Sequence, residues 1–322
     1  IFNHLLLQVK FMNGLIGNTP MIKIKYKYKE KENFIYAKLE WFNLTGSIKD
    51  RLIYYILNKT NLENITTLVE ATSGNTGIAL AALGNYYKKK VVIFMPDFVS
   101  EERKTLLKSY GAKLHLISQK EGGFIKCVKL AKEYSKRKNT LLINQFSNKL
   151  NIDTHYYTTG KEILDKLNNI GGFVSGIGSA GTLIGISKRL KSVFPNLKVA
   201  LLEPTDAEVV AKNKATPHKI EGIADFFIPD NFNKENITNY YSINDNDAIN
   251  MSKKLAKELG LGVGISSGAN FLGSVLLSEE VNNVVTVFPD DNKKYLSVLK
   301  DDTLLKEDFI SNNIELISYE IV

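Results

Sequence analysis

The chain has 322 residues, of which 44% are hydrophobic and 24% are charged, and its formal net charge is +8. This composition is typical of a folded protein with enough residues for two domains of ordinary size. The 42 basic residues are mixed with 34 acidic ones along the chain. This mixing argues against a nucleic-acid-binding protein. No run of about 18 apolar residues occurs, so we expect no membrane-spanning helix and no membrane partner.

The few cysteine and histidine residues limit the chemistry further. The single cysteine, Cys127, can form no disulfide within the chain, and the four histidines lack the spacing of zinc ligands. Residues 1–10 lack the charge-first pattern of a signal peptide. These features predict a cytoplasmic protein that holds no metal ion.

Predicted strands and helices alternate along the chain. The expected strands cover residues 21–25, 34–40, 67–71, 90–96, 113–117, 140–146, 172–175, 199–203 and 283–288. The expected helices cover 48–57, 78–87, 100–111 (with Ser100 as its N-cap), 123–136, 158–167, 183–191 and 245–259, and another opens at 264–270. The acidic tail from residue 301 is expected to be peripheral. This alternation indicates parallel sheets covered by helices, with functional groups at the carboxyl ends of the strands.

Lys49 lies at such a junction, between the strand at 34–40 and the helix that follows. A polar turn with Gly46 and Ser47 precedes it. Most lysines are solvated surface residues, and this one taken alone would be no exception. A lysine held partly out of water, however, has a lowered pKa and a nucleophilic amine, which Schiff-base chemistry requires. Lys49 is therefore a candidate catalytic residue.

Three loops of small residues precede helices, at 72–76, 176–182 and 264–268. Backbone N–H groups at a helix N-terminus carry partial positive charge and bind anions. Any single loop of this kind is explained equally well by tight packing. Three of them in one chain predict a ligand or ligands with at least two anionic groups.

One of these loops also matches the dinucleotide-binding fingerprint. Gly176, Gly178 and Gly181 have its spacing, and Glu203 ends the next strand, where a ribose-binding acid would lie. An NAD-dependent enzyme is therefore an alternative. It is a weak one, because it leaves Lys49 without a role.

Taken together, the motifs resemble a known family. They occur in the family's order between residues 17 and 297: Gly17-Asn-Thr-Pro20, Thr45-Gly-Ser-Ile-Lys-Asp-Arg51, Thr72-Ser-Gly-Asn-Thr-Gly77, His155 with Thr158-Thr-Gly160, the loop 178–182, Gly264-Ile-Ser-Ser-Gly268 and Tyr295-Leu-Ser297. The chain resembles the cysteine synthase (O-acetylserine sulfhydrylase) and cystathionine β-synthase family. These are pyridoxal-phosphate enzymes of fold type II.

The resemblance implies a fold like that of the tryptophan synthase β-subunit. We expect two parallel-sheet, three-layer α/β domains that close over a cofactor cleft, with Lys49 between them. The smaller domain would span 34–150 and carry the substrate loop Thr72–Thr76. The larger would combine 1–33 with 151–322 and carry the phosphate loop. The resemblance also implies a homodimer.

The resemblance assigns roles to individual residues around pyridoxal 5'-phosphate. Lys49 would form the Schiff base and later move the Cα proton, Asn75 would hydrogen-bond the ring hydroxyl, and Ser266 would face the pyridine nitrogen. The phosphate would be held by Gly178, Ser179, Ala180, Gly181 and Thr182. The carboxylate of an amino-acid substrate would be held by Thr72, Ser73, Thr76 and Gln145.

The implied reaction is β-elimination or β-replacement on a cysteine- or serine-type amino acid through an α-aminoacrylate. Two departures from the family pattern are tolerable in this interpretation: Leu44 replaces a proline, and Ala180 replaces a glycine. A third puts Asp290 and Asp291 where the family usually has two serines. We expect both acids to lie away from the cofactor ring.

The departure at Asp225 is the most informative. The family usually shows Gly-Ile-Gly-Ala-Gly-Phe, whereas this chain has Gly222-Ile-Ala-Asp-Phe-Phe227. A surface loop that has drifted would explain the change. If Asp225 instead faces the substrate, its charge would repel HS⁻ and could activate water. The favoured reaction is then L-cysteine plus water giving L-serine plus hydrogen sulfide.

Other reactions and roles stay open at this point. Cysteine synthesis from O-acetylserine and sulfide is one, and a β-replacement synthase in which Asp225 binds the amino group of a second substrate is another. A serine or threonine deaminase and a non-catalytic, partner-binding homologue are the remaining alternatives.

Overall fold

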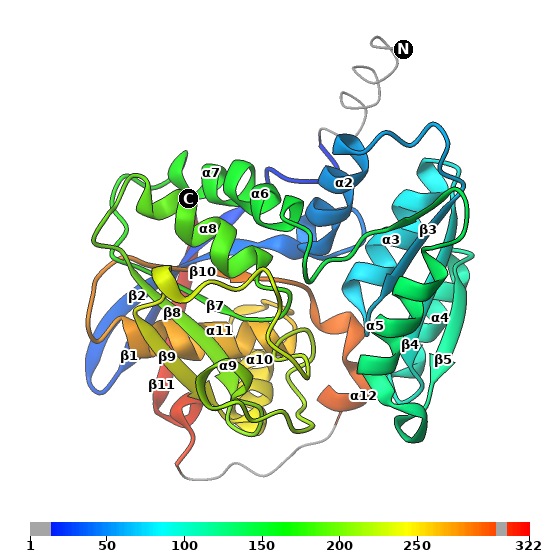
Figure 1. Ribbon diagram of the computed structural model, residues 1–322. Helices are drawn as coiled ribbons and strands as arrows, with labels where there is room; N and C mark the ends of the chain where they lie inside the picture. The colour runs from blue at the N-terminus through cyan, green and yellow to red at the C-terminus, as the bar shows by residue number, and fades with distance from the viewer. Residues whose placement is uncertain (1–13, 301–307) are drawn as a thin grey trace.

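The computed structural model describes residues 14–300 and 308–322 and contains two β-sheets in separate lobes (Figure 1). Residues 1–13 of the predicted larger domain lie outside the described residues, and they include residues 1–10, the segment compared with a signal peptide. The start of the predicted peripheral tail also lies outside them. The larger sheet has the order β11 (Ile314–Ile321), β1 (Met21–Tyr28), β2 (Lys31–Leu39), β10 (Val284–Phe288), β7 (Gly172–Gly176), β8 (Lys198–Pro204) and β9 (Asn239–Ile243). The smaller has the order β5 (Lys113–Ile117), β4 (Lys90–Pro96), β3 (Thr67–Ala71) and β6 (Thr140–Leu142).

Helices connect and cover the strands. They are α2 (Lys49–Lys59), α3 (Asn75–Tyr86), α4 (Glu101–Ser109), α5 (Gly123–Tyr134), α6 (Leu150–Tyr157), α7 (Thr159–Leu164), α8 (Gly181–Lys191), α9 (Val209–Lys212), α10 (Asp245–Leu259), α11 (Ile265–Leu277) and α12 (Leu296–Leu299). Within the described ranges, no helix combines the length and the apolar character needed to cross a membrane.

The smaller sheet is parallel throughout, and helices cover both of its faces. Alternate residues of a strand point to opposite faces. In β4, Val91 and Ile93 pack in the cluster that contains α2, α3 and α4, whereas Val92 and Phe94 pack against α5. This double burial explains why the strands read as continuous apolar runs.

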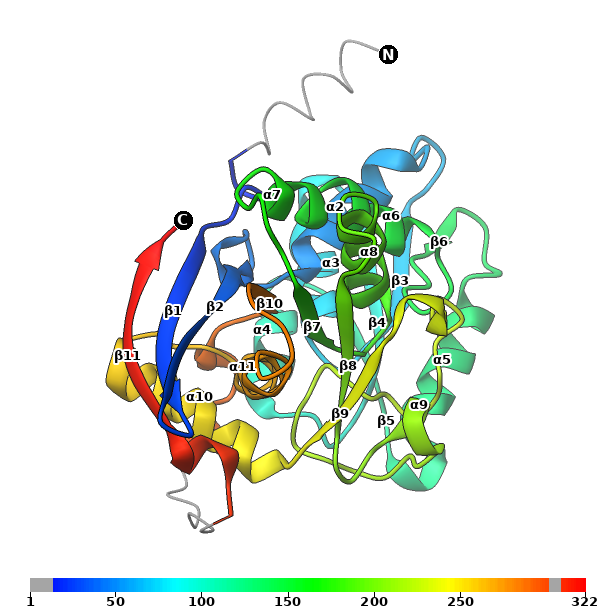
Figure 2. The same cartoon turned by 90° about the vertical axis from the view of Figure 1, so that its left-hand side faces the viewer.

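The larger sheet is parallel only from β2 to β9. Strands β1 and β2 form an antiparallel hairpin, and β11 adds antiparallel to β1 at the edge (Figure 2). The hairpin follows from its turn, where Lys29 and Glu30 both have positive φ, 48° and 63°. Two such residues match the twist of antiparallel strands. The two-lobed, parallel-sheet fold class is confirmed, with this antiparallel edge as a correction.

The predicted division into domains needs one adjustment at its first boundary. A boundary at residue 34 puts most of β2 in the smaller domain, yet β2 pairs with β1 and β10 in the larger sheet. The hairpin turn holds β2 beside β1, so the chain crosses to the smaller lobe only after β2, in the loop that leads to α2. The C-terminal segment is likewise part of the sheet, as β11.

Several predicted element ends also shift. The strand predicted at 140–146 ends at Leu142, and Asn144 adopts a positive φ of 57°. Helix α6 was missed altogether. Ser100 precedes α4 as predicted, but its side chain makes no capping hydrogen bond.

Candidate active site

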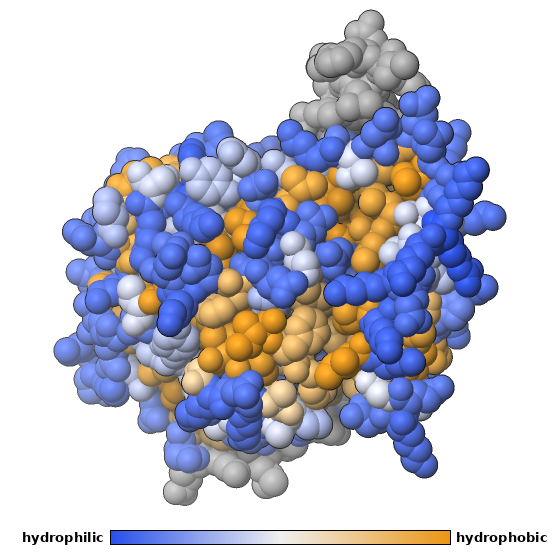
Figure 3. Space-filling model, viewed as in Figure 1, coloured by the Kyte–Doolittle hydropathy of each residue, from blue (hydrophilic) through white to orange (hydrophobic). Residues whose placement is uncertain are grey.

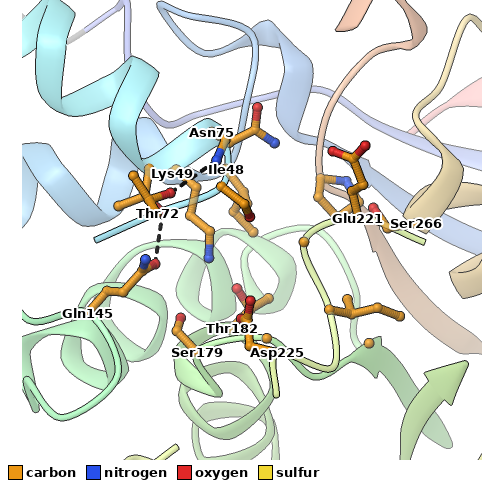
Figure 4. A pocket seen from close by; sticks show the side chains of 18 of the residues that line it. Ile48, Lys49, Thr72, Asn75, Gln145, Ser179, Thr182, Glu221, Asp225 and Ser266 are labelled. Carbon is orange, nitrogen blue, oxygen red and sulfur yellow. Dashed lines mark hydrogen bonds between the residues drawn. The ribbon is translucent and has the colours of Figure 1, made fainter. Parts of the chain in front are cut away.

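A cavity lies between the two lobes, at the carboxyl ends of the parallel strands. Residues from both lobes line it, as Figure 4 shows for Lys49, Thr72, Asn75, Gln145, Ser179, Thr182, Glu221, Asp225 and Ser266. On the face of the molecule shown in Figure 3, hydrophilic side chains cover most of the margin, and apolar side chains gather towards the middle. All the residues predicted to hold cofactor or substrate, except Gly181, line this one cavity, and Gly181 lies within its loop.

Lys49 is the first residue of α2, and its amine points towards Ser179, Thr182 and Asp225 (Figure 4). The loop before it is closed by Asp50, which accepts hydrogen bonds from Thr45 N at 2.9 Å and from Thr45 Oγ1 at 2.6 Å. Burial lowers the pKa of Lys49, and the Asp225 carboxylate opposes this shift. A larger fraction of neutral, nucleophilic amine follows.

The loop at 72–76 ends at the N-terminus of α3. No side chain caps this helix, whose N-cap residue is Gly74. Thr76 Oγ1 donates to Gln145 Oε1 at 2.8 Å, and Gly74 N donates to Thr72 Oγ1 at 3.1 Å. The hydroxyls and the amide thus surround an uncapped helix end, which is suited to a carboxylate.

The loop at 178–182 forms the second uncapped helix end, at the start of α8. Ala180 is its N-cap residue, with a φ of 66°. A Cβ at Gly178 would lie 2.4 Å from Gly222 O, and one at Gly181 would lie 1.9 Å from Asn151 Oδ1. Only glycine fits at these two positions. Backbone donors of the first turn remain available for a phosphate without any basic side chain.

Asn75 and Ser266 face the cavity from opposite lobes. Asn75 Nδ2 donates to Asp290 Oδ2 at 2.7 Å, while its Oδ1 is buried and has no partner. The Tyr295 hydroxyl donates to the same oxygen of Asp290 at 2.7 Å. Asp290 and Asp291 do not line the cavity themselves, but Asp290 directly holds the residue expected to contact the ring.

Asp225 lines the same cavity as Lys49, as the functional interpretation of its loop requires. Ala224 N donates to Ile177 O at 2.6 Å, and the Phe227 ring lies 4.9 Å from that of Phe146. These contacts fix the segment on both sides of Asp225. Burial raises the pKa of Asp225 to about 6, and the Lys49 charge opposes the shift.

Three residues of the site were not predicted. Arg103 and Glu221 line the cavity and form an ion pair. His155, quoted only as part of a motif, contacts Thr182 Oγ1 through Nε2 at 3.3 Å. Burial keeps the pKa of His155 well below its usual value, so the ring is neutral. Nothing in the local sequence around Arg103 distinguishes it from the charged residues beside it on α4.

Glu203, the proposed ribose ligand of the NAD alternative, is already engaged. It is fully buried, and its carboxylate accepts hydrogen bonds from Val210 N at 2.7 Å and Ala211 N at 3.0 Å. It therefore caps the start of α9. Among the described residues, no group of three or more His, Cys, Asp or Glu could hold a metal ion.

The remaining features fit pyridoxal phosphate. The cavity offers a lysine with a lowered pKa, an uncapped helix end built from glycines, and a buried amide oxygen without a partner. The aldehyde of the cofactor would react with the lysine, and its phosphate would lie at the uncapped helix end. Its ring hydroxyl would hydrogen-bond the buried amide oxygen.

Comparisons with known proteins agree with this fit. The family described as "Pyridoxal-phosphate dependent enzyme" matches residues 12–290. A cysteine synthase of Staphylococcus aureus is 36% identical over 292 residues, which are 88% of this chain and 94% of that protein. An O-acetylserine dependent cystathionine beta-synthase of Bacillus subtilis is 35% identical over 294 residues, 88% of this chain and 94% of that protein.

A solved structure is more similar still. A hydrogen sulfide-producing enzyme of Fusobacterium nucleatum is 46% identical and superposes with a TM-score of 0.95, over 98% of this chain and 99% of that one. An Asp→Asn variant of that enzyme has been solved with an α-aminoacrylate intermediate.

Proposed function

The chain belongs to the pyridoxal-phosphate dependent enzyme family, and from this premise we propose that it converts L-cysteine and water into L-serine and hydrogen sulfide. It is an enzyme that acts at the β-carbon of an amino acid, as its relatives do, and its cofactor is pyridoxal phosphate. The family assignment excludes the NAD-dependent alternative. The observation that carries the proposal is Asp225, a carboxylate that shares the cavity with Lys49.

Lys49 would hold the cofactor and move the Cα proton. Bound pyridoxal phosphate withdraws electrons from Cα, so that this proton and the β-substituent can leave. The lowered pKa of Lys49 suits a group that must accept and return a proton near neutral pH.

The other residues would bind and orient. Asn75 would hold the ring hydroxyl, and Ser266, on the first turn of α11, would face the pyridine nitrogen. The phosphate would lie on the α8 N-terminus, with Gly178, Ser179, Ala180, Gly181 and Thr182. The substrate carboxylate would lie on the α3 N-terminus, with Thr72, Ser73, Thr76 and Gln145.

Asp225 would select and activate the nucleophile. As an anion it repels HS⁻, so sulfide that has left cysteine is not readily added back. As a base it takes a proton from water while the water oxygen bonds to Cβ. The carbon–sulfur bond of cysteine is broken, sulfur leaves as hydrogen sulfide, and the oxygen of water becomes the serine hydroxyl. No oxidant or reductant is required.

The test is a product assay on the purified, yellow protein with L-cysteine. Sulfide and L-serine should form in equal amounts. Asp225→Asn should reduce serine formation about 100-fold, within the usual range for removal of a general base. Asp230→Asn, which changes an exposed carboxylate outside the cavity, is the matched control. If Asp225→Asn makes serine as fast as the native enzyme, Asp225 is not the water activator.

The names of the relatives favour a second candidate, cysteine synthesis from O-acetylserine and sulfide. The same assay with these two compounds distinguishes the reactions, since the native enzyme should then be a poor synthase and Asp225→Asn a better one. A deaminase would instead release pyruvate and ammonia. The homodimer remains a prediction.

A further inference from the structure

Asn231 lies where three segments of the active site meet. Its Nδ2 group donates to Gln145 O at 2.8 Å and to Ser179 O at 3.4 Å. Gln145 belongs to the proposed substrate site, and Ser179 belongs to the proposed phosphate site. Asn231 itself ends the Asp225 loop, which comprises residues 222–231. The proposed function gives Asn231 no role.

An asparagine at position 231 is costly to bury. The residue is only 1% exposed, and its Oδ1 is buried without a hydrogen-bond partner among the described residues. A buried amide with an unpaired oxygen stabilises a fold less than an apolar side chain of similar size does. The two hydrogen bonds of Nδ2 are what leucine could not supply, and both end on residues of the proposed active site.

The Asp225 loop depends on its contacts with the rest of the protein. Ala224, the residue before Asp225, has a φ of 48°, a left-handed conformation that residues other than glycine seldom adopt. Such a conformation persists only where the surrounding structure holds it. One contact that does so is the hydrogen bond from Ala224 N to Ile177 O at 2.6 Å, near the start of the loop. The end of the loop needs an anchor as well, because a segment held at one end can still swing.

Asn231 is the anchor at that end. The Phe227 ring packs on the Phe146 ring, with 4.9 Å between centroids, but an apolar contact fixes direction less sharply than a hydrogen bond. Asp230 accepts a hydrogen bond from Ser147 Oγ at the surface, where water competes for both groups. The side-chain hydrogen bonds of Asn231 are buried, and its backbone N adds a third, to Phe146 O at 3.1 Å. The end of the loop is therefore held in place chiefly by Asn231.

We propose that Asn231 is a positioning residue, which sets the place of Asp225 by holding the end of the Asp225 loop against the substrate and phosphate sites. The inference rests on the proposed function, because it concerns the residue that would activate water. Addition of water to the β-carbon needs Asp225 in place, whereas the earlier loss of sulfide is assigned to Lys49 and the cofactor. Asn231 should therefore matter for the second half of the reaction and not for the first.

Asn151 provides an internal comparison. Its Nδ2 group also donates to Gln145 O, at 2.9 Å, and to Ser179 Oγ, at 2.8 Å, and the residue is fully buried. Asn151 lies on α6, however, and not on the Asp225 loop. Gln145 O keeps one donor when either asparagine is replaced. The two asparagines thus share their contacts with the binding sites and differ in their link to Asp225.

The test separates the two halves of the reaction in single turnovers of the holoenzyme. Sulfide released from L-cysteine reports the first half. L-serine formed from O-acetylserine, whose acetate is a better leaving group than sulfide, reports the addition of water. Asn231→Leu keeps the size of the side chain without its hydrogen bonds. It should leave sulfide release nearly unchanged and slow serine formation about tenfold, since displacement of a reacting group by about 1 Å costs up to roughly 100-fold.

Two other variants serve as controls. Asn151→Ala should affect the Kd of pyridoxal phosphate or the release of sulfide, and not the formation of serine. Asn233→Ala changes a partly exposed amide just beyond the loop and should alter neither rate. The absorbance of the bound cofactor verifies that each variant is folded and loaded. If Asn231→Leu does not fold, Asn231→Ala removes the same side-chain hydrogen bonds without adding bulk and takes its place.

A double variant shows whether Asn231 acts through Asp225. In the Asp225→Asn background the base is already absent, so adding Asn231→Leu should slow serine formation no further. Two losses that multiply would mean that Asn231 acts independently of Asp225, which contradicts the proposal. A loss of stability alone would not produce this dependence on Asp225.

Three further outcomes overturn the inference. In Asn231→Leu, these are serine formation at the native rate, or an equal loss in both halves of the reaction, which would indicate a general structural defect. The third is a loss of serine formation in Asn151→Ala as large as in Asn231→Leu, which would place the effect at Gln145 and not at the loop. If the native enzyme forms no serine from either donor, the proposed function itself fails, and the inference falls with it.

Discussion

Asp290 Oδ2 accepts a hydrogen bond from Asn75 Nδ2 at 2.7 Å. The two residues come from different lobes, Asn75 from the start of α3 and Asp290 from the segment after β10. Asp290 is fully buried, and it also accepts a hydrogen bond from the Tyr295 hydroxyl. A carboxylate between these two donors fixes the amide of Asn75 and ties the lobes together beside the cavity.

Replacing Asp290 should therefore weaken cofactor binding. Asp290→Ala leaves the amide of Asn75 and the hydroxyl of Tyr295 without their acceptor, at a cost of roughly 1–3 kcal/mol. We expect the Kd of pyridoxal phosphate to rise about tenfold, measured by titrating apo-protein and following the yellow absorbance. Asp291→Ala, on the adjacent partly exposed residue, is the control. Equal affinity in the two variants would show that Asp290 does not position Asn75.

Serine formation should depend on the ionisation of Asp225. Burial raises the pKa of this carboxyl to about 6, so the base is lost as pH falls through about 6. Below that pH the rate should fall about tenfold per pH unit, since one proton removes the base. The measurement is kcat for serine from pH 5 to 8, and Asp225→Asn should lack this inflection. An unchanged inflection in the variant would assign it to another group.

Binding of L-cysteine should be sensitive to a negative charge at position 145. Its amide accepts a hydrogen bond from Thr76 at the proposed site for the substrate carboxylate. Gln145→Glu places a second carboxylate there, and like charges at close range repel. We expect the KM for L-cysteine to rise about 100-fold, for roughly 2.7 kcal/mol. Asn282→Asp, an exposed change of the same kind, should leave KM unaltered. Similar KM values for both variants would show that the substrate carboxylate does not bind beside Gln145.

A buried ionic network should control stability near Lys49. Arg51, on α2, contacts Glu40 at 2.6 Å and Glu162 at 2.6 Å, and Lys38 contacts Glu162 at 2.7 Å. Removing one member of such a buried network leaves an unpaired charge and costs roughly 3–5 kcal/mol. Glu162→Gln should lower the free energy of unfolding by about this amount in urea titrations. Asp165→Asn, which breaks a surface pair with Lys161, should cost less than about 1 kcal/mol.

The pH dependence of unfolding provides a second measurement on Glu162. Although burial acts to raise it, the pKa of this carboxyl is lowered to about 2 by Arg51 and Lys38. A lowered folded-state pKa contributes stability that is complete above the unfolded value near 4.5 and is lost as pH falls towards about 2. The native protein should lose stability over this range more steeply than Glu162→Gln. Parallel curves would show that Glu162 does not carry the acid sensitivity.

Several features were predictable because they depend on neighbouring residues. Lys49, Asn75 and the loop at 178–182 lie in short motifs whose glycines and small side chains dictate the turn before a helix. The alternation of strands and helices was equally predictable, because parallel strands buried on both faces appear in the sequence as continuous apolar runs. The antiparallel pairing of β11 was not predictable, because it joins segments almost 300 residues apart and has no local signal.

The motifs along the chain indicated the cofactor family, the candidate lysine and the two loops proposed to bind anions, since each of these is a local property of backbone and side chain. The tertiary structure alone decided the second layer of the site: that Asp225 shares a cavity with Lys49, that Asp290 holds Asn75, and that Arg103 meets Glu221. These contacts join residues far apart in the chain. Their burial, charge and pKa arise only when the lobes come together and exclude water.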